Sequence, residues 1–308
     1  MFVKMLKLKN ALKKIYGLKF KTNFEMKSIT SFKIGGKAKI FIEPSNLEHF
    51  IKVYHLLSDL KIPYVVLGNC TNVLISDKGF EGAVIKIGNE FSNFEIHDNL
   101  IIARSGALLN KIISVACKNN LQGMEEGFGI PGTIGGAVYM NASAYSFEMA
   151  GVVKSVLAMV DGKIKEFSNA ECEFGYRKSV FQKLTNVIIL EVEFDLKKVV
   201  NVNLFEIALA TMKKRRESQP LNTFNAGSIF KKVGNESAGK IIDELGLKSF
   251  SCGGAKISEK HANFIENYNN ATFNDVMVLI DFIKKYVKVN KDINLETEIK
   301  VIGEEKWF

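Results

Sequence analysis

Two turn-rich segments have residue types that could bring backbone amides close to a phosphate group. The first is Gly68-Asn69-Cys70-Thr71-Asn72, and the second is Gly129-Ile130-Pro131-Gly132-Thr133-Ile134-Gly135-Gly136-Ala137. Glycine lets the backbone approach a bulky ligand, and successive N–H groups in a turn form a concave anion site. The second segment alone fits a tight structural crossing equally well. Together, the two segments favour a pair of loops that hold one phosphate-bearing cofactor.

Two nucleotide-binding signatures occur in the sequence without their structural context. Residues 127–132 spell GxGxxG, but a helix-like segment precedes them and Pro131 stands where an amide donor is needed. Residues 234–240 spell GxxxxGK, but Ile241 follows where a P-loop needs Ser or Thr. We therefore predict neither a Rossmann site nor a nucleoside triphosphatase. Residues 234–240 are interpreted as a polar turn that enters a helix ending at Gly246.

The composition is that of an ordinary globular chain. Its 308 residues are 47% hydrophobic and 24% charged, which excludes a disordered or collagen-like protein and predicts no membrane insertion. The net charge of +9 would suit a nucleic-acid binder, but only four of the 42 basic residues are arginines, and base recognition favours arginine. We therefore predict no nucleic-acid partner, because an anionic small substrate explains the charge equally well.

The four cysteines and the N-terminus indicate a cytoplasmic protein. Cys70, Cys117, Cys172 and Cys252 lie far apart, with no CxxC pair and no histidine at ligand spacing, so we predict neither a metal site nor a disulfide framework. Lysines interrupt every apolar run of residues 1–19, and no small-residue cleavage site follows. We interpret this segment as neither a signal peptide nor an anchor.

The elements that position these loops follow from the periodicity of apolar residues. A capping box at Ser45–Glu48 predicts a helix to about residue 61, and Leu108 and Leu109 open the apolar face of a helix over 106–120. Asp161-Gly162 predicts a hairpin. The remaining predictions are strands at 62–67, 73–75, 152–160, 163–167, 186–196 and 295–302, and helices at 203–217, 238–245 and 272–289. The predicted class is α+β.

Seven segments, in order over residues 28–303, resemble UDP-N-acetylenolpyruvoylglucosamine reductases. They are residues 31–36, 68–74, 129–137 with Asn141, 174–181, 225–231, 258–264 and 295–299. Seven ordered segments are far more specific than one short motif. The two turn-rich segments alone would fit any flavoprotein with the same FAD-binding module. The last four segments are those that distinguish the reductase.

The resemblance implies a fold and an activity. The fold is a two-lobed FAD-binding module, like that of the PCMH and vanillyl-alcohol oxidase group, followed by an α+β substrate-binding domain. We expect lobes at 1–88 and 89–198 and a substrate domain at 199–308, whose C-terminal strand returns to the active site. The implied enzyme is a cytoplasmic monomer that binds FAD. It takes hydride from NADPH and reduces UDP-N-acetylglucosamine enolpyruvate to UDP-N-acetylmuramate for peptidoglycan synthesis.

The resemblance also implies roles for individual residues. Arg177 stabilises the substrate carboxylate as charge builds, Ser228 protonates the carbanion, and Glu298 interacts with the same carboxylate. The substrate-binding residues are Tyr176, Lys231 and Lys232, and no metal ligand is implied. The FAD-binding residues are Gly35, Gly68, Asn69, Cys70, Thr71, Asn72, Ile130, Pro131, Gly132, Thr133, Gly135, Gly136, Ala137 and Asn141.

Several positions depart from the family pattern. Asn69, Cys70, Ser143 and Ser146 replace glycines, and Lys232-Val233 replaces Asn-Pro. The short interval between Arg177 and Ser228 resembles the subgroup that lacks an inserted substrate-covering loop. Two alternatives stay open at this point. One is another oxidoreductase on the same flavin module, for example a hydroxy-acid oxidase, and the other is a basic scaffold or nucleic-acid-binding protein without flavin.

Overall fold

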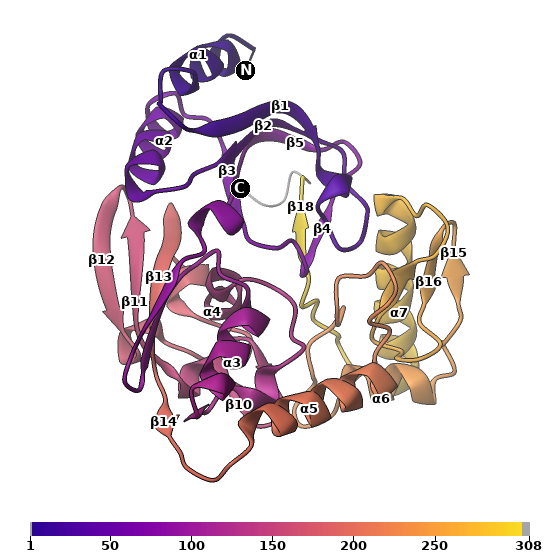
Figure 1. Ribbon diagram of the computed structural model, residues 1–308. Coiled ribbons are helices and arrows are strands. Elements are labelled where there is room, and N and C mark those ends of the chain that lie inside the picture. Colours follow the sequence, from indigo (N-terminus) through magenta and orange to yellow (C-terminus); the bar gives the residue numbers. More distant parts are fainter. Residues whose placement is uncertain (1, 304–308) are drawn as a thin grey trace. The chain divides into compact units, whose positions relative to one another are not determined.

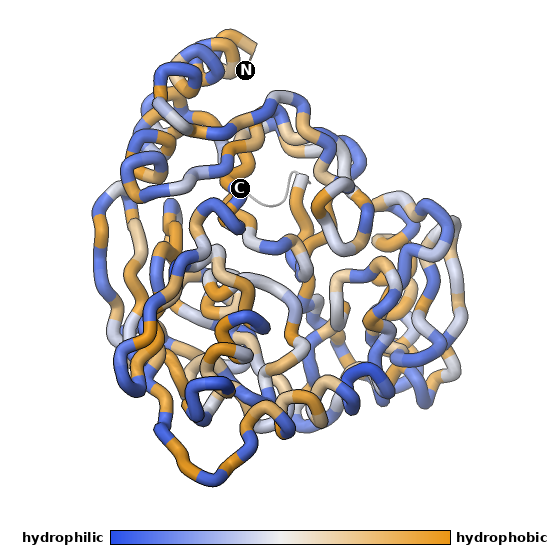
Figure 2. The backbone as a smooth tube through the Cα atoms, viewed as in Figure 1, coloured by the Kyte–Doolittle hydropathy of each residue, from blue (hydrophilic) through white to orange (hydrophobic). Residues whose placement is uncertain are grey.

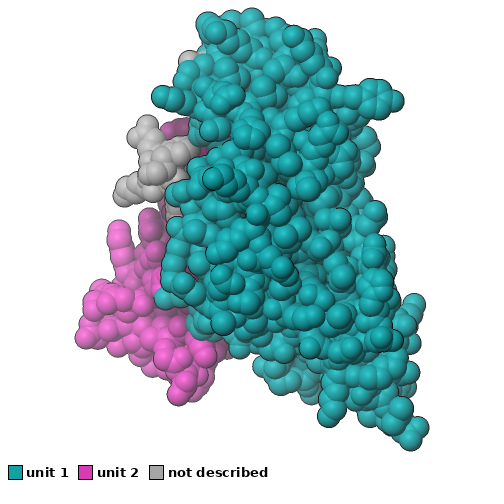
Figure 3. All heavy atoms as spheres, turned by 90° about the vertical axis from the view of Figure 1, so that its left-hand side faces the viewer, with its two compact units in different colours: residues 1–22, 40–69, 82–214 teal, residues 23–39, 70–81, 215–308 magenta. Residues whose placement is uncertain are grey.

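The computed structural model describes residues 2–303, which form two compact units (Figure 3). Unit 1 consists of residues 1–22, 40–69 and 82–214, and unit 2 of residues 23–39, 70–81 and 215–308. Each unit is therefore assembled from segments that are separated in the sequence. The predicted boundaries at 88 and 198 stay predictions, and positions 1 and 304–308 of the predicted ranges lie outside the described residues.

Unit 1 contains an antiparallel five-stranded sheet in the order β12-β11-β13-β7-β6, of which β12, β11 and β13 are labelled in Figure 1. Its strands are β6 (Phe94–His97), β7 (Leu100–Arg104), β11 (Val153–Val160), β12 (Lys163–Ser168) and β13 (Val187–Asp195). The β11–β12 hairpin turns at Asp161-Gly162, whose positive φ angles of 47° and 78° suit a two-residue turn, as predicted. Helices α3 (Leu109–Lys118) and α4 (Ile134–Tyr139) contribute side chains to the core beside this sheet.

The N-terminal part of unit 1 has its own apolar core. Helices α1 (Phe2–Leu12) and α2 (Leu47–Asp59) pack with a sheet in the order β1-β2-β5-β3, and hydrophilic and hydrophobic positions mix along α1 (Figure 2). The strands are β1 (Lys19–Glu25), β2 (Lys37–Glu43), β3 (Tyr64–Leu67) and β5 (Phe80–Lys86). Strands β1, β2 and β5 each run from one unit into the other along the chain.

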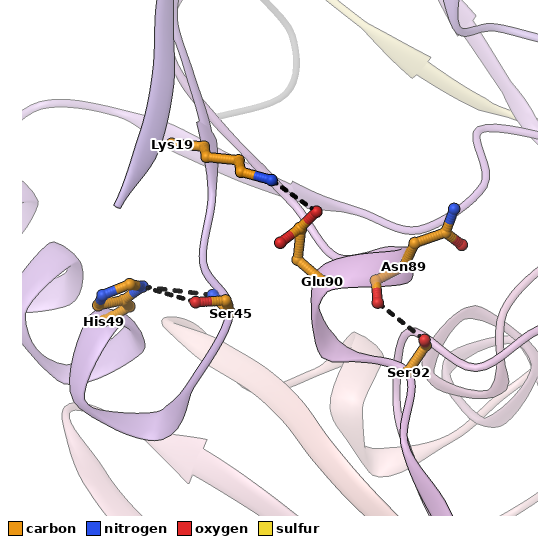
Figure 4. A network of polar contacts seen from close by, with 6 residues as sticks. All are labelled: Lys19, Ser45, His49, Asn89, Glu90 and Ser92. Atoms are coloured by element: carbon orange, nitrogen blue, oxygen red, sulfur yellow. Dashed lines mark hydrogen bonds and ion pairs between the residues drawn. The ribbon is translucent and has the colours of Figure 1, made fainter. Parts of the chain in front are cut away.

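The predicted cap of α2 is wrong by one residue. Asn46, rather than Ser45, is the N-cap, and its Oδ1 accepts the His49 N–H at 2.9 Å. Ser45 instead donates its own N–H to His49 Nδ1 at 3.3 Å, because the imidazole lies back over the start of the helix (Figure 4). The same view shows the 2.8 Å ion pair between Lys19 and Glu90.

Unit 2 packs α6 (Ala238–Glu244) and α7 (Phe273–Lys291) with short strands around one apolar core. Strands β15 (Ser251–Cys252), β16 (Ala255–Ile257) and β17 (Ile265–Asn267) form a sheet, while β18 (Lys300–Ile302) pairs in parallel with β4 (Val73–Ile75). Thr272 and Asp275 form a capping box at α7. Helix α5 (Leu204–Ser218) begins in unit 1 and ends in unit 2.

Shorter elements complete the described chain. They are the strands β8 (Leu121–Gln122), β9 (Ser143–Ala144), β10 (Phe147–Glu148) and β14 (Lys197–Lys198), and the 3-10 turns η1 (Met26–Ser28), η2 (Asn89–Phe91), η3 (Glu125–Gly127), η4 (Met149–Gly151), η5 (Ala170–Cys172) and η6 (Val180–Gln182). The α+β class is confirmed. Polar residues 234–237 lead into α6, as predicted.

Two predictions from periodicity are wrong in detail. The predicted strand at 295–302 is regular only over 300–302, because residues 296–298 contact the chain near Phe230 instead of a continuous partner strand. Ile302 is consequently buried, although the alternation placed it on the polar face. Leu108 is exposed, since it lies at the N-cap of α3 rather than on its apolar face.

Residues 2–303 contain neither a membrane-spanning helix nor a cluster of metal ligands. No helix there is long and apolar enough to cross a membrane. The same residues contain no group of three histidine, cysteine or acidic side chains that could hold a metal ion. All four cysteines are free thiols.

Candidate active site

In unit 1, the two predicted cofactor loops meet at Gly68 and Thr133. A Cβ atom added at Gly68 would lie only 2.3 Å from Thr133 Oγ1. Thr133 is the N-cap of α4, and this same Oγ1 accepts the Gly136 N–H at 3.4 Å. Glycine at position 68 is therefore required by the close approach of the two loops.

The second loop is attached to residues 105–107 by backbone hydrogen bonds. Gly135 N–H donates to Ser105 O at 2.9 Å, and Ile134 N–H donates to Ala107 O at 2.8 Å. Ser105 Oγ is buried and has no hydrogen-bond partner within residues 2–303. A buried hydroxyl of this kind is costly unless a ligand satisfies it. The close-approach glycine and this hydroxyl both fit a bound group such as FAD.

Not every predicted cofactor residue lies in a loop. Gly135, Gly136 and Ala137 form part of helix α4, because Thr133 already caps it. Ile130, Pro131 and Gly132 precede this cap, and Gly132 has a positive φ of 132°. The glycine-rich segment thus consists of a turn followed by one short helix.

In unit 2, the first loop continues from Cys70, and segment 31–36 fixes it. Cys70 O accepts the Ser31 N–H at 3.2 Å and Ser31 Oγ at 3.3 Å. Cys70 has a φ of 53°, in the left-handed region that favours glycine, which the family often has here. Asn72 O accepts the Lys300 N–H at 3.0 Å, so β18 also holds this loop. Gly35, another predicted FAD-binding residue, also lies in unit 2. Asn69, the predicted FAD-binding residue before Cys70, lies in unit 1 and is exposed.

Asn141 is used by the protein's own framework. The side chain is fully buried, and its Nδ2 donates to Glu148 Oε1 at 2.6 Å and to Gly175 O at 2.9 Å. Its Oδ1 accepts the Ala150 N–H at 3.0 Å. These bonds tie the β9–β10 hairpin to the turn at Gly175, so the Asn141 amide is committed to the protein's own framework.

Arg177 projects from a tight turn in unit 1. Lys178 N–H donates to Gly175 O at 2.9 Å, and Arg177, with φ 55°, occupies the third position of this turn, where a type II turn requires positive φ. Arg177 Nη1 donates to Ser143 Oγ at 2.8 Å and to Ser143 O at 3.3 Å. The guanidinium carbon lies 5.4 Å from the centre of the Tyr176 ring.

In unit 2, Asn263 holds the segment that carries Ser228. Asn263 Nδ2 donates to Phe230 O at 2.8 Å, its Oδ1 accepts the Phe230 N–H at 2.9 Å, and its backbone O accepts the Ile229 N–H at 2.8 Å. Asn263 is buried. The motif at 258–264 therefore serves to fix the motif at 225–231.

Ser228 and Glu298 are brought together by one backbone hydrogen bond. Glu298 N–H donates at 2.8 Å to the carbonyl oxygen of Ile229, the residue that follows Ser228. Both side chains are half-buried. Ser228 Oγ makes no hydrogen bond to any other part of the described chain, so its hydroxyl can serve a ligand. Arg177 belongs to unit 1.

The lysines of unit 2 differ in their surroundings. Lys231 is mostly buried and bonds to Glu296, whereas Lys232 is exposed. Burial, and the charge of Lys231, lower the pKa of Lys300 below its usual range. Lys240 pairs with Glu236 at 3.3 Å on the helix surface. Of the predicted substrate lysines, Lys231 is therefore held in place by a carboxylate.

His261 is a structural residue in this arrangement. Its Nδ1 accepts the Asn263 N–H at 3.2 Å, and its ring contacts Phe264 edge to face. Burial lowers the pKa of His261 below its usual value of 6.5, which favours the neutral imidazole that can accept this bond.

A pocket of about 350 Å³ opens in unit 2 beside the end of α5. Its lining includes residues 219–223 and the charged side chains Arg216, Lys256, Lys260, Glu259 and Glu266. Lys260 Nζ bonds to the backbone oxygen of Arg216, which holds these two cations together. The lining carries three cations and two carboxylates, and Lys256 is already paired with Glu259 at 3.0 Å, so Arg216 and Lys260 are the cations that could meet an anionic ligand.

Three residues of the candidate site were missed by reasoning from sequence. Asn263 lies within a family segment, but nothing in the pattern distinguished its side chain from its neighbours. Ser143 bonds to Arg177, which lies far away in the sequence, and Ser105 is distinguished only by the burial of its unpaired hydroxyl, so only tertiary structure identifies these two serines.

Comparison with known proteins gives consistent results along the chain. A model for the FAD binding domain matches residues 38–165, and a model for the C-terminal domain of UDP-N-acetylenolpyruvoylglucosamine reductase matches residues 219–302. Two curated relatives of that name are each 42% identical. The one from Anoxybacillus flavithermus aligns over 92% of this chain and 94% of its own length, and the one from Caldanaerobacter subterraneus subsp. tengcongensis over 97% of both.

A solved structure agrees with these sequence matches. The crystal structure of UDP-N-acetylenolpyruvylglucosamine reductase from Thermus caldophilus is 31% identical and superposes with a TM-score of 0.79. The match covers 93% of this chain and 99% of that one. The predicted order, with a flavin module followed by a reductase C-terminal domain, is confirmed by the positions of the two family models.

Proposed function

Because this chain belongs to the UDP-N-acetylenolpyruvoylglucosamine reductase family, we propose that Arg177, Ser228 and Glu298 carry out its reaction. The protein is an FAD-dependent UDP-N-acetylmuramate dehydrogenase that uses NADPH. It reduces the enolpyruvyl ether of UDP-N-acetylglucosamine to UDP-N-acetylmuramate, a precursor of peptidoglycan. The identity of about two residues in five over almost the whole chain supports this activity.

The protein's first task is to hold FAD, which when bound relays a hydride from NADPH to the substrate. Residues 68–72 and 130–137 are proposed to line the cofactor, and the close approach of Gly68 to Thr133 supports a shared site in unit 1. Ser105 Oγ, buried beside Gly135, is proposed to satisfy its hydrogen-bonding capacity with the same ligand. Gly35 and Asn141 are proposed to support these loops rather than to contact the cofactor through side chains.

Arg177 is proposed to bind the carboxylate of the enolpyruvyl group. Hydride addition at one carbon drives negative charge onto its neighbour and the attached carboxylate, so a fixed cation lowers the energy of the transition state. A guanidinium fork matches a carboxylate, and the turn at 175–178 holds it at a defined place. Tyr176, whose ring lies near this guanidinium, is proposed to contact the substrate as well.

Ser228 is proposed to donate the proton that completes the reduction. The observation that carries this assignment is that Ser228 Oγ has no hydrogen-bond partner within residues 2–303, although its backbone is firmly held by Asn263 and Glu298. A positioned hydroxyl that is not committed to the protein can transfer its proton to a developing carbanion. Glu298, next to this segment, is proposed to interact with the substrate carboxylate.

The nucleotide part of the substrate is proposed to use the cations of unit 2. Lys231 is held by Glu296, and the cations beside the end of α5 line a pocket of about 350 Å³. Lys232 is exposed and replaces the asparagine common in the family, so it is proposed as an alternative contact to the diphosphate.

Five further properties are proposed. The enzyme is cytoplasmic and monomeric, and it has no nucleic-acid partner. The short interval between Arg177 and Ser228 supports the subgroup without the inserted loop. Its substrate-binding domain is proposed to begin near residue 199.

One spectroscopic titration tests the function. Purified protein is expected to show flavin absorbance, to lose it on anaerobic addition of NADPH, and to regain it on addition of UDP-N-acetylglucosamine enolpyruvate. Loss without recovery would indicate a flavoenzyme with another acceptor. A protein that shows no flavin spectrum even after addition of FAD would overturn the proposal.

A further inference from the structure

The Nη1 atom of Arg177 contacts Ser143 twice. The hydroxyl accepts a hydrogen bond at 2.8 Å, and the backbone carbonyl of the same residue accepts another at 3.3 Å. Any residue at position 143 provides the carbonyl, but the shorter bond needs a side-chain acceptor, which the serine hydroxyl provides and glycine lacks. Hydrogen bonds from a charged donor are roughly twice as strong as neutral ones.

Both partners are mounted on the same rigid piece of unit 1. The buried amide of Asn141 bonds to Glu148 at 2.6 Å and to Gly175 O at 2.9 Å, so it joins the hairpin of Ser143 to the turn of Arg177. Gln182 Nε2 adds bonds to Arg177 O at 3.0 Å and Tyr139 O at 2.8 Å. The hydroxyl is therefore a fixed acceptor rather than a mobile surface group.

Arg177 is half-buried, and each acceptor that holds its long side chain reduces the number of rotamers it samples. Arginine loses about 2 kcal/mol of rotamer freedom when it is held in one geometry. Two bonds from one nitrogen, together with the attachment at Cδ, define the direction of the guanidinium plane. Part of the side-chain entropy that Arg177 would lose on binding the substrate is then lost already in the free enzyme. This pre-organisation raises catalytic efficiency.

We propose that Ser143 is a positioning residue, whose hydroxyl pre-orients the Arg177 guanidinium for the carboxylate of the substrate. This inference rests on the proposed role of Arg177. It assigns a purpose to a serine that stands where the family pattern has glycine, and it adds a residue to the machinery of unit 1.

The neighbouring hairpin provides a matched control. Ser146 lies in the same hairpin and also replaces a glycine, and its hydroxyl and N–H both bond to Glu126 Oε2. Ser143→Ala and Ser146→Ala each remove one hydroxyl from this hairpin. The Ser143 hydroxyl accepts a hydrogen bond, whereas the Ser146 hydroxyl donates one. Only the first removes a bond to Arg177.

The experiment measures reoxidation of the NADPH-reduced enzyme by the enolpyruvyl nucleotide sugar in stopped flow. Ser143→Ala is expected to slow reoxidation about tenfold, because one hydrogen bond to a charged group is lost. Its bound flavin, its melting temperature and its reduction by NADPH are expected to stay unchanged. Ser143→Thr is expected to restore the rate, and Ser146→Ala to match the wild type.

Three results separate the possible failures. Equal reoxidation rates for Ser143→Ala and the wild type, together with slow reoxidation by Arg177→Lys, would overturn the role of Ser143 alone. Full activity of Arg177→Lys would overturn the proposed function of Arg177 itself. Loss of flavin or of melting temperature in Ser143→Ala, without rescue by threonine, would assign Ser143 to structure and overturn the proposal. Weaker substrate binding, measured by titrating the flavin spectrum of oxidised Ser143→Ala, would support it.

Discussion

Asn263 uses both ends of its side-chain amide on the backbone of one residue, Phe230. Nδ2 donates to the carbonyl oxygen at 2.8 Å, and Oδ1 accepts the N–H at 2.9 Å. The side chain thus takes the place of a neighbouring strand, since it satisfies a donor and an acceptor that would otherwise be buried without partners. The consequence is that the Ser228 segment has a fixed backbone without belonging to a regular sheet.

Replacement of this amide by a carboxylate tests that role. In Asn263→Asp the Nδ2 donor is lost and a charge faces Phe230 O, so we expect the free energy of unfolding to fall by roughly 3 kcal/mol. Urea denaturation followed by circular dichroism measures the change. Asn269→Asp, at an exposed position in the same part of the chain, is the control. Equal midpoints for the two variants would contradict the role given to Asn263.

Gly68→Ala tests the contact between the two cofactor loops. The new Cβ atom would lie 2.3 Å from Thr133 Oγ1, and moving this hydroxyl would remove the cap of α4. We expect FAD to bind at least about tenfold more weakly, which corresponds to ~1.4 kcal/mol. Flavin per protein after gel filtration measures this. Gly151→Ala adds a methyl group where no atom lies within 4 Å, and it should retain FAD fully.

Ser228→Ala separates the two halves of the reaction. The variant is expected to bind FAD and to be reduced by NADPH at the wild-type rate, because the serine hydroxyl takes no part in either step. Reoxidation by the enolpyruvyl substrate is expected to slow by about 10²–10⁴-fold, as for loss of a general acid. Stopped-flow absorbance measures both rates. Unimpaired reoxidation would remove Ser228 from the mechanism, and partial activity in Ser228→Cys would support proton donation.

His261 predicts how stability depends on pH on the acid side. Because burial lowers the pKa of the folded imidazole, the unfolded chain takes up a proton at a higher pH than the native chain does. The free energy of unfolding is therefore expected to decrease as pH falls below about 6.5, the ordinary pKa of histidine. Above that pH the imidazole is neutral in both states, so His261 causes no pH dependence there. Urea midpoints between pH 7.5 and 5 give the slope.

Replacing His261 tests whether this side chain causes the pH dependence of the urea midpoint. His261→Gln is expected to flatten it, whereas His97→Gln, at an exposed position on β6, should leave it as in the wild type. If both variants have the same slope as the wild type, burial of His261 is not its source.

The local features of this fold could be predicted from sequence. The Asp161-Gly162 hairpin and the helix entered after residues 234–237 depend on turn and cap residues that are adjacent in the chain. The position of the α2 cap could not be decided between Ser45 and Asn46, because both residues are good caps and the choice follows from where His49 lies. Local chemistry therefore gave the type of each element more securely than its end.

Tertiary pairing explains the remaining differences. The alternation at 295–302 suggested one strand, but the partners of this segment are Ile229, Lys231 and strand β4, which no local pattern identifies. The family segments pointed to Ser228 and Glu298, and the structure supplies the hydrogen bond through Ile229 that links them. Ser143 could be singled out only as a departure from a glycine, whereas its contact with Arg177 depends on folding.

The interleaved segments of the two units have a consequence for the order of events on the ribosome. Unit 1 has its full sequence once Lys214 has been added, and N-terminal parts of a chain generally fold first during synthesis. Segments 23–39 and 70–81 emerge early, yet their core residues Phe32, Ile34 and Leu74 pack with side chains that come after residue 225. These apolar side chains therefore stay exposed in the nascent chain until the second half is made. A chaperone would be expected to bind and shield them during that time.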